Sequence, residues 1–410
     1  MTSIHATGAP VVDAPDSFAR KALIASAVGY AMDGFDLLIL GFMLRAISAD
    51  LSLTPPQAGS LVTWTLVGAV AGGILFGMLS DYYGRVRVLT WTILLFAVFT
   101  GLCAFAQGYW DLLVYRTIAG LGLGGEFGIG MALVAEAWPA KQRARACSYV
   151  ALGWQAGVLC AALVTPLLLP SIGWRGMFIV GLIPGIVAFA VRWYVGEPKI
   201  FTDRVAQPRS MAPLGMLVKD TATTKVSLGM FILCSVQNFG YYGLMIWMPS
   251  YLSNKFGFGL TQSAMWTAVT VLGMAFGIFA FGHFADRVGR RPALLTFQAG
   301  AFIMVLIYSQ LTDATALLVG GAVMGIFVNG MLGGYGALLS ELYPTEARAT
   351  AENVLFNLGR GVGGFGPLVV GALVATYSFT AAIALLALIY LVDIMATVFL
   401  IPERKGQPLT

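Results

Sequence analysis

Long apolar stretches separated by short polar segments make up most of the chain. Each stretch holds roughly 20 mainly apolar residues, the length that an α-helix needs to cross a bilayer. The pattern predicts about twelve such helices, which nearly exhausts the 410 residues. They are expected at 22–45, 57–80, 87–107, 110–135, 147–169, 173–195, 225–250, 261–284, 292–311, 314–340, 350–376 and 379–401.

The twelve stretches form two groups of six. An N-terminal bundle is expected over 22–195 and a C-terminal bundle over 225–401. The segment 196–224 is rich in proline and charge and is expected to be a cytoplasmic linker. Cytoplasmic tails are expected at 1–21 and 402–410. The predicted fold class is therefore an all-α membrane protein.

Composition and charge support this class. Apolar residues make up 58% of the chain and charged residues 10%, and the mean hydropathy is +0.83. A soluble domain could not cover its surface with so few charges. Lys and Arg gather in alternate connections, for example at Arg85, Arg143 and Arg290. The positive-inside rule places these connections and both termini in the cytoplasm, so we expect a multi-pass protein of the cytoplasmic (inner) membrane.

One pattern occurs twice at a constant offset. GMLSDYYGR at 77–85 recurs as GHFADRVGR at 282–290, and Glu136 recurs as Glu341. The offsets are equal, since 282 − 77 = 205 and 341 − 136 = 205. Equal order in both halves indicates a parallel repeat, an arrangement in which substrate binds near the bilayer midplane between the halves.

The repeated motifs combine groups that can hold one conformation. Gly77 and Gly84 permit close helix packing and a tight turn, Asp81 can face a helix N-terminus or a basic partner, and Arg85 can bind carboxylates or lipid phosphate. We expect a conformational latch. Its predicted members are Gly77, Asp81, Gly84, Arg85, Glu136, Arg143, Asp286, Arg290, Glu341 and Arg348.

The two copies of this motif resemble the signature of the major facilitator superfamily, and the resemblance covers both halves. LVYRTIAG at 113–120 also resembles the helix-4 motif of that superfamily, with Arg116 as its membrane-embedded arginine. The resemblance implies the major facilitator fold and transport by alternating access. The helix-5 pattern of the drug antiporters is met only by Gly153 and Gly157, with Val158 at the position of its proline, which disfavours drug efflux.

A narrower resemblance lies in GYAMDGFD at 29–36, GGEFG at 124–128 and EAWP at 136–139. These stretches look like the bacterial sialic acid and monocarboxylate:proton symporters, and the first also resembles the aromatic acid:proton symporters. The sialic acid branch often carries two extra central helices. This chain lacks them, so a smaller organic acid is expected.

Ionisable residues inside a membrane are costly and therefore indicate candidate functional sites. Counted from the helix ends, Asp36 and Arg116 lie at similar depths and are expected to pair. Asp33 lies one turn from Asp36, and Glu126 lies near the middle of helix 4. We expect these four residues to handle a coupling proton. A structural salt bridge and helix-packing hydrogen bonds are the alternatives.

A lone cation marks the second half. Arg360 is expected near the midplane, where a guanidinium can hold a carboxylate through two parallel hydrogen bonds. A structural pair with Asp393 is the alternative. Amides and aromatic residues expected to face inward complete the predicted substrate-binding site. They are Gln237, Asn238, Tyr242, Asn329, Asn357, Trp154 and Gln155.

The function predicted from the sequence is proton-driven uptake of a small organic acid anion, a monocarboxylate or an aromatic acid. Transport of a neutral or cationic solute, such as a sugar or drug, is the alternative. No nucleophile–base pair, nucleotide loop or metal spacing is visible, so we expect no enzyme activity, catalytic residue, bound metal or cofactor besides the coupling proton. The expected partners are the organic acid, the proton and the lipid bilayer, with no nucleic acid and a monomeric state.

Overall fold

The described part of the chain is helical. The computed structural model describes residues 15–182, 186, 196–198, 201–202, 212–257, 260–407 and 409. The helices of the first half are α1 (Ser17–Asp50), α2 (Pro55–Tyr83), α3 (Arg85–Cys103), α4 (Tyr109–Ala137), the 3-10 helix η1 (Ala140–Gln142) and α5 (Arg143–Val180). Those that follow are α8 (Pro213–Met216), α9 (Thr221–Phe256), α10 (Leu260–Val288), α11 (Arg290–Gln310), α12 (Ala314–Gly330), α13 (Leu332–Leu342), α14 (Arg348–Gly363), α15 (Gly366–Thr376), α16 (Phe379–Ala387) and α17 (Ile389–Leu400).

Among the described residues, nine helical stretches are long and apolar enough to cross a membrane. The nine differ from the predicted twelve partly because some neighbouring helices run together. Within α5, two helices meet at Gly173, whose φ of 66° and ψ of 176° are not helical. Most of the predicted helix 173–195 beyond residue 182, and most of the predicted linker 196–224, lie outside the described residues.

The helix ends differ from those predicted by hydropathy. The first helix begins at Ser17 rather than 22, because the side chain of Asp16 accepts a hydrogen bond from the backbone N–H of Ala19 at 2.7 Å and caps the helix. It ends at Asp50 rather than 45. Polar helix ends carry little hydropathy signal, so the prediction shortened this helix at both ends.

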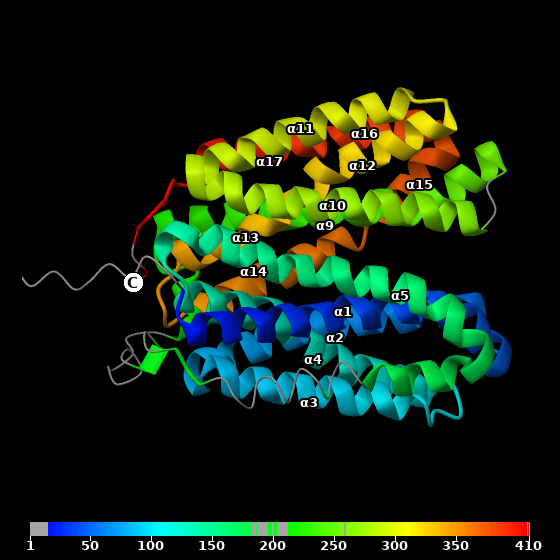
Figure 1. Cartoon of the computed structure of the whole chain (residues 1–410), viewed down its shortest axis with the longest axis horizontal. Coiled ribbons are helices and arrows are strands. Elements are labelled where there is room, and N and C mark those ends of the chain that lie inside the picture. Colours follow the sequence, from blue (N-terminus) through cyan, green and yellow to red (C-terminus); the bar gives the residue numbers. More distant parts are fainter. Residues whose placement is uncertain are drawn as a thin grey trace, which may run out of the picture.

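The helices form two bundles that lie side by side. In Figure 1, α1 to α5 form one bundle and α9 to α17 form the other. The bundles meet where α14 packs against α2 and α4, and where α10 and α13 pack against α5. Long helices from opposite halves therefore face each other along a seam, and polar groups placed on that seam are enclosed by both halves.

The internal repeat is visible in the backbone. Gly84 and Gly289 both have a φ of 113°, and 289 − 84 = 205. A left-handed φ favours glycine, and a Cβ built at either position would fall 2.4 or 2.7 Å from a carboxylate oxygen, of Glu197 and of Glu403 respectively. Glu197 accepts hydrogen bonds of 2.7–3.2 Å from the first backbone N–H groups of α3. Glu403 accepts bonds of 2.9 and 3.1 Å from those of α11.

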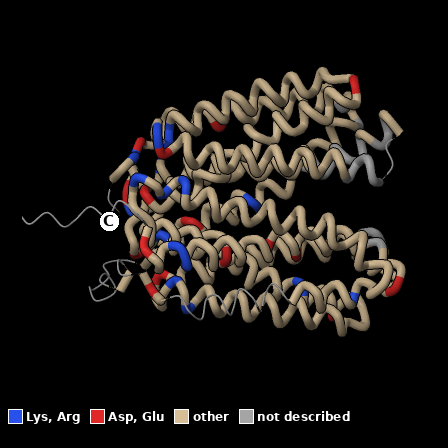
Figure 2. Tube along the Cα trace, viewed as in Figure 1, with Lys and Arg blue, Asp and Glu red and all other residues tan. Residues whose placement is uncertain are grey.

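Basic side chains concentrate at one end of the molecule. Figure 2 shows most Lys and Arg at the end where the labelled C-terminus lies. The junctions of α2 with α3 and of α10 with α11 are both at this end, which we call the basic end, and the opposite one the far end. Both copies of the repeated motif therefore lie at the same end, as the equal offset predicts.

Candidate functional site

Two ion-pair networks join the halves at the basic end. In the first, Arg85 contacts Asp81 at 2.7 Å and Glu136 at 3.0 Å, and Arg348 contacts the same oxygen of Glu136 at 2.7 Å. All four side chains are fully buried. Glu136 therefore binds one arginine of its own half and one of the other.

The second network repeats the first with the halves exchanged. Arg290 contacts Asp286 at 2.9 Å and Glu341 at 2.7 Å, and Arg143 of the first half contacts Glu341 at 3.0 Å. Glu341 thus binds one arginine from each half, as Glu136 does. At the basic end the two halves are therefore joined through Glu136 and Glu341.

The two aspartates of the motif also cap helices across the seam. Asp81 accepts hydrogen bonds from the backbone N–H of Thr350 at 2.8 Å and from its hydroxyl at 2.6 Å, at the start of α14. Asp286 accepts bonds from the N–H groups of Ala144 at 3.2 Å and Arg145 at 3.1 Å, at the start of α5. A carboxylate at a helix N-terminus satisfies open N–H groups and complements the helix dipole.

Close packing supports the same contact. A Cβ at Gly77 would lie 3.0 Å from the side chain of Asn353 and 3.2 Å from the carbonyl oxygen of Ala349, both in α14. With the turn glycine Gly84, the structure brings all ten predicted latch residues to the basic end.

A buried ion pair joins α1 to α4. Arg116 donates to both carboxylate oxygens of Asp36, at 2.7 and 3.0 Å. Thr100 Oγ1 donates to Asp36 at 3.3 Å, and Arg116 Nε donates to Thr65 Oγ1 at 3.4 Å. The predicted Asp36–Arg116 pair is present, with two threonines that the sequence did not indicate.

The other two predicted proton-handling residues lie at different distances from this pair. Asp33 is buried and lies one turn before Asp36 on α1. Glu126 accepts a hydrogen bond from Thr92 Oγ1 of α3 at 2.9 Å. It lies ten residues from Arg116 on α4, or about 15 Å along the helix axis. The four residues therefore do not form one cluster.

A small cavity with a volume of about 10 Å³ lies between the halves. Two of its lining residues, Tyr30 and Trp154, come from the first half. The others come from α9, α12, α13 and α14. The predicted substrate-binding residues that line it are Trp154, Gln237, Asn238, Tyr242, Asn329 and Arg360.

Arg360 is the cation of this cavity. Its side chain is 2% exposed, and its guanidinium carbon lies 5.5 Å from the ring centroid of Trp154 and 5.1 Å from that of Phe356. Within the described residues, no carboxylate lies within 4.0 Å of it, and its Nε has no hydrogen-bond partner. Asp393, the alternative partner, instead accepts a bond from Gln298 at 3.0 Å.

Amide groups lie beside this guanidinium in the cavity wall. Gln237 Nε2 donates to Asn329 Oδ1 at 2.5 Å, and Asn238 Nδ2 donates to the carbonyl oxygen of Cys234 at 2.9 Å. Gln237 Oε1 and Asn329 Nδ2 are buried without a partner in the described part of the chain. The cavity thus offers one cation, one unused amide donor and one unused amide acceptor.

Two predicted substrate-binding residues lie elsewhere. Asn357 Nδ2 donates to the carbonyl oxygens of Gly124 at 2.9 Å and Asn353 at 3.0 Å, and so holds α14 against α4. Gln155 is buried next to Trp154 but does not line the cavity, and its amide has no hydrogen-bond partner among the described residues. The amide groups of these two residues predicted that both would be buried, but not the direction in which each side chain points.

Aromatic residues separate the cavity from the basic end. Phe127 of α4 stacks on Phe356 of α14 with centroids 3.7 Å apart and an interplanar angle of 17°, and Tyr30 lies 5.2 Å from Phe127. Phe356 follows Arg348 by eight residues and precedes Arg360 by four, so the stack lies roughly 12 Å from the ion pairs along the axis. The sequence did not predict this layer, because phenylalanine is also the ordinary residue of lipid-facing surfaces.

Glu352 is a second feature that the sequence did not predict. It is fully buried in α14, and its Oε1 accepts a hydrogen bond from Ser340 Oγ at 2.5 Å. Its Oε2 has no hydrogen-bond partner within the described residues. An acid inside a predicted membrane helix, here 350–376, is the signal that could have identified it.

The far end is held by an exposed cluster around Asp50. Arg175 pairs with Asp50, stacks over Trp174 at 4.1 Å and donates to the carbonyl oxygen of Ala106 at 3.1 Å. The hydrogen bonds from Arg175 and then from Trp174 hold the pKa of the Asp50 carboxyl below its usual range. This cluster ties the end of α1 to the loop between α3 and α4 and to the segment after Gly173.

Comparison with known proteins identifies the family. The sequence profile of the Major Facilitator Superfamily matches residues 26–270 and 251–410. The chain belongs to this superfamily. A Haemophilus influenzae protein provisionally named as a metabolite transport protein is 68% identical, over 96% of this chain and 98% of its own length. The cis,cis-muconate transport protein of Acinetobacter baylyi is 29% identical, over 95% and 96% of the two chains.

A solved structure supports the same fold. The proton:xylose symporter XylE superposes with a TM-score of 0.80 at 18% identity, covering 96% of this chain and 98% of that one. The protein is therefore a multi-pass membrane transporter, and the cavity of Arg360 lies between the two halves of a major facilitator fold.

Proposed function

We propose that this transporter takes up a small organic acid anion together with protons. The observation that carries the proposal is Arg360, a buried cation in the inter-half cavity with no carboxylate of the described residues within 4.0 Å. A desolvated guanidinium without a counter-ion is unfavourable, so an anionic ligand is its natural partner.

The side chains that line the cavity favour a ligand in which a carboxylate is attached to a flat or apolar group. The guanidinium fork matches the two oxygens of a carboxylate. The rings of Trp154 and Phe356 lie beside the same guanidinium and make the wall around it aromatic. Gln237 Oε1 and Asn329 Nδ2 can bind a second polar group. With a volume of about 10 Å³ the cavity has room for about one water in this closed arrangement, so it must widen to admit the substrate, as alternating access requires.

Proton coupling is assigned to the Asp36–Arg116 pair. Protonation of Asp36 would release Arg116 from its two hydrogen bonds and allow α1 and α4 to rearrange. Asp33 lies on α1 between Asp36 and the cavity residue Tyr30, three residues from each. Substrate bound at Arg360 would lie beside Tyr30 of α1, and the proton would bind to an acid of the same helix. Substrate and proton would therefore both act on α1. Glu126 is the remaining candidate for proton transfer.

The basic end is proposed to face the cytoplasm, with both termini on that side. Its concentration of Lys and Arg is the reason, since the positive-inside rule assigns such an end to the cytoplasm. The eight residues of the two networks, with Gly77 and Gly84, would then act as a cytoplasmic latch. The latch closes the path from the cavity in one state and breaks in the other, as alternating access requires.

Relatives and the cavity both favour an organic acid over the alternative of a neutral or cationic solute. The Acinetobacter relative is named for the transport of muconate, an organic acid. No acidic residue lines the cavity among the described residues, and Glu126 bonds to Thr92 instead. A cationic substrate would have to bind beside Arg360 without a carboxylate partner.

The test is ligand binding by calorimetry to purified Arg360→Lys and Arg360→Ala. Losing a buried charge-assisted pair costs about 2–5 kcal/mol, so Arg360→Ala should weaken binding by well over about tenfold. Lysine keeps the charge but loses the two-point contact, so Arg360→Lys should also bind poorly. Arg175→Lys is the matched control, because Arg175 also stacks on a tryptophan but lies at the far end.

The ligand for the calorimetry is identified beforehand by measuring uptake into proteoliposomes. Labelled monocarboxylates, aromatic acids and sugars are compared with and without an inward proton gradient. Near wild-type affinity of folded Arg360→Ala for the transported acid would move the carboxylate site elsewhere. Concentrative sugar uptake that survives Arg360→Ala would favour the alternative function.

A further inference from the structure

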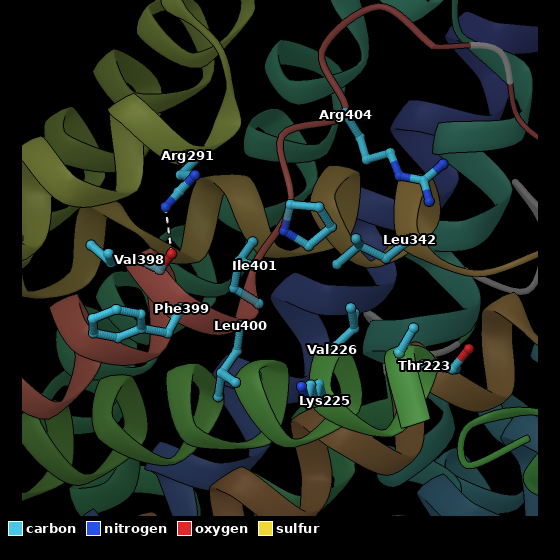
Figure 3. Close-up of a pocket in the computed structure, with 12 residues that line it drawn as sticks. Thr223, Lys225, Val226, Arg291, Leu342, Val398, Phe399, Leu400, Ile401 and Arg404 are labelled. Carbon is cyan, nitrogen blue, oxygen red and sulfur yellow. Dashed lines mark hydrogen bonds between the residues drawn. The ribbon is translucent and has the colours of Figure 1, made fainter. Parts of the chain in front are cut away.

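A pocket at the basic end of the second half belongs neither to the cavity nor to the ion-pair networks. Its volume is about 550 Å³, and it is lined by residues of α9 and α11, by Leu342 at the end of α13 and by the segment around the end of α17. Three cations line it, Lys225, Arg291 and Arg404, and we call it the basic pocket. Figure 3 shows these residues reaching it from three separate segments, around apolar side chains of α17.

The cations of the basic pocket lack counter-ions. None of the three has a carboxylate within 4.0 Å in the part of the chain that the structure describes. Glu403, the acid next to Arg404, instead accepts hydrogen bonds from the backbone N–H groups of Arg290, Arg291, Arg404 and Lys405. The pocket therefore carries an excess of positive charge and attracts an anion.

The guanidinium of Arg291 is held in place and keeps one N–H donor without a hydrogen bond. Arg291 Nη2 donates to the carbonyl oxygen of Val398, which fixes the guanidinium against the end of α17 (Figure 3). Its Nε is buried and has no hydrogen-bond partner among the described residues. A fixed guanidinium with an unused donor suits an oxyanion such as a phosphate.

Apolar side chains beside the cations point to the rest of the ligand. Phe399 is 74% exposed and Val398 38% exposed, and both line the pocket. Leu228, which follows Lys225 by three residues on α9, is 51% exposed. In a membrane protein, cations bordered by exposed apolar residues at a helix end lie at the level of the lipid headgroups. An inorganic phosphate would use the cations but leave these apolar residues without a partner.

We propose that the basic pocket binds the phosphate of an anionic phospholipid, with its acyl chains along Phe399 and Leu228. Each cation near a lipid phosphate is expected to strengthen binding by about fivefold. The proposal needs only that the protein spans a membrane, so it stands apart from the choice of transported substrate.

The test is native mass spectrometry of the full chain in detergent with phosphatidylglycerol or zwitterionic phosphatidylcholine added. Wild type should retain phosphatidylglycerol at least about tenfold more tightly than phosphatidylcholine. Lys225→Gln combined with Arg404→Gln should weaken phosphatidylglycerol binding by about 25-fold, and adding Arg291→Gln should weaken it further. The control Lys219→Gln removes an exposed cation that does not line the pocket and should bind normally.

Two results would overturn the proposal. Phosphatidylglycerol retention unchanged in the double variant would show that lipid binds elsewhere. Displacement of the lipid by millimolar inorganic phosphate, without any difference between the two lipids, would identify a site for free anions. Thermal unfolding without added lipid checks that each variant is folded, and the double variant leaves the Arg291–Val398 contact intact.

Discussion

Glu136→Gln is expected to open the basic end of the molecule. Glu136 Oε1 accepts from Arg85 at 3.0 Å and from Arg348 at 2.7 Å, and all three side chains are fully buried. Glutamine keeps the shape but removes the charge that the two guanidinium groups share. Removing one partner of a buried ion pair costs about 3–5 kcal/mol in the closed state. In an open state water reaches the guanidinium groups and relieves most of this cost.

The size of the shift toward the open state follows from the difference in cost between the closed and open states. A net change of about 3 kcal/mol moves the ratio of open to closed protein by roughly a hundredfold. Cys147 reports on this equilibrium, because it is fully buried on α5, four residues after Arg143 of the second network. With Cys103, Cys160 and Cys234 replaced by serine, alkylation of Cys147 by N-ethylmaleimide should be faster by a similar factor in Glu136→Gln.

The control lies at the other end of the molecule. Asp50→Asn removes the exposed Asp50–Arg175 pair at the far end and should leave the alkylation of Cys147 unchanged. An alkylation rate within about twofold of the parent, in Glu136→Gln that still binds substrate, would refute the reasoning. If that variant does not fold, Glu341→Gln removes the matching carboxylate of the second network and gives the same test.

Two further predictions concern the proton and the topology. Asp36→Asn should abolish uphill accumulation but retain substrate exchange in proteoliposomes, because the amide resembles the protonated acid; unchanged concentrative uptake would remove Asp36 from the coupling step. Cysteines introduced at the exposed positions Tyr83 and Val288 should react with an impermeant maleimide from the same, cytoplasmic side of inverted vesicles. Reaction of the two from opposite sides would contradict the proposed sidedness.

The sequence was informative wherever spacing alone determines contact. The rise of an α-helix is constant, so depth arithmetic was enough to pair Asp36 with Arg116. The 205-residue offset likewise paired Gly84 with Gly289, since both turns require the same left-handed backbone. Contacts within one half, or between copies of one motif, are therefore open to prediction from the chain itself.

Contacts across the seam were harder to predict. Asn357 and Arg360 are three residues apart, yet one bonds to α4 and the other faces the cavity. Which of the two directions leads to the cavity depends on the rotation of α14, and hydropathy does not fix this rotation in a helix buried on many sides. The stack of Phe127 on Phe356 depends on how the two bundles dock, which neither half encodes alone.

The exchanged contacts at the basic end have a consequence for how this protein can change over generations. Asp81 caps a helix of the second half and Asp286 caps one of the first, while Glu136 and Glu341 each hold an arginine from both. A duplicated half therefore could not drift freely after fusion, because a substitution in one copy removes a ligand from the other. Compensating changes at these positions must arise in pairs on opposite halves of the chain.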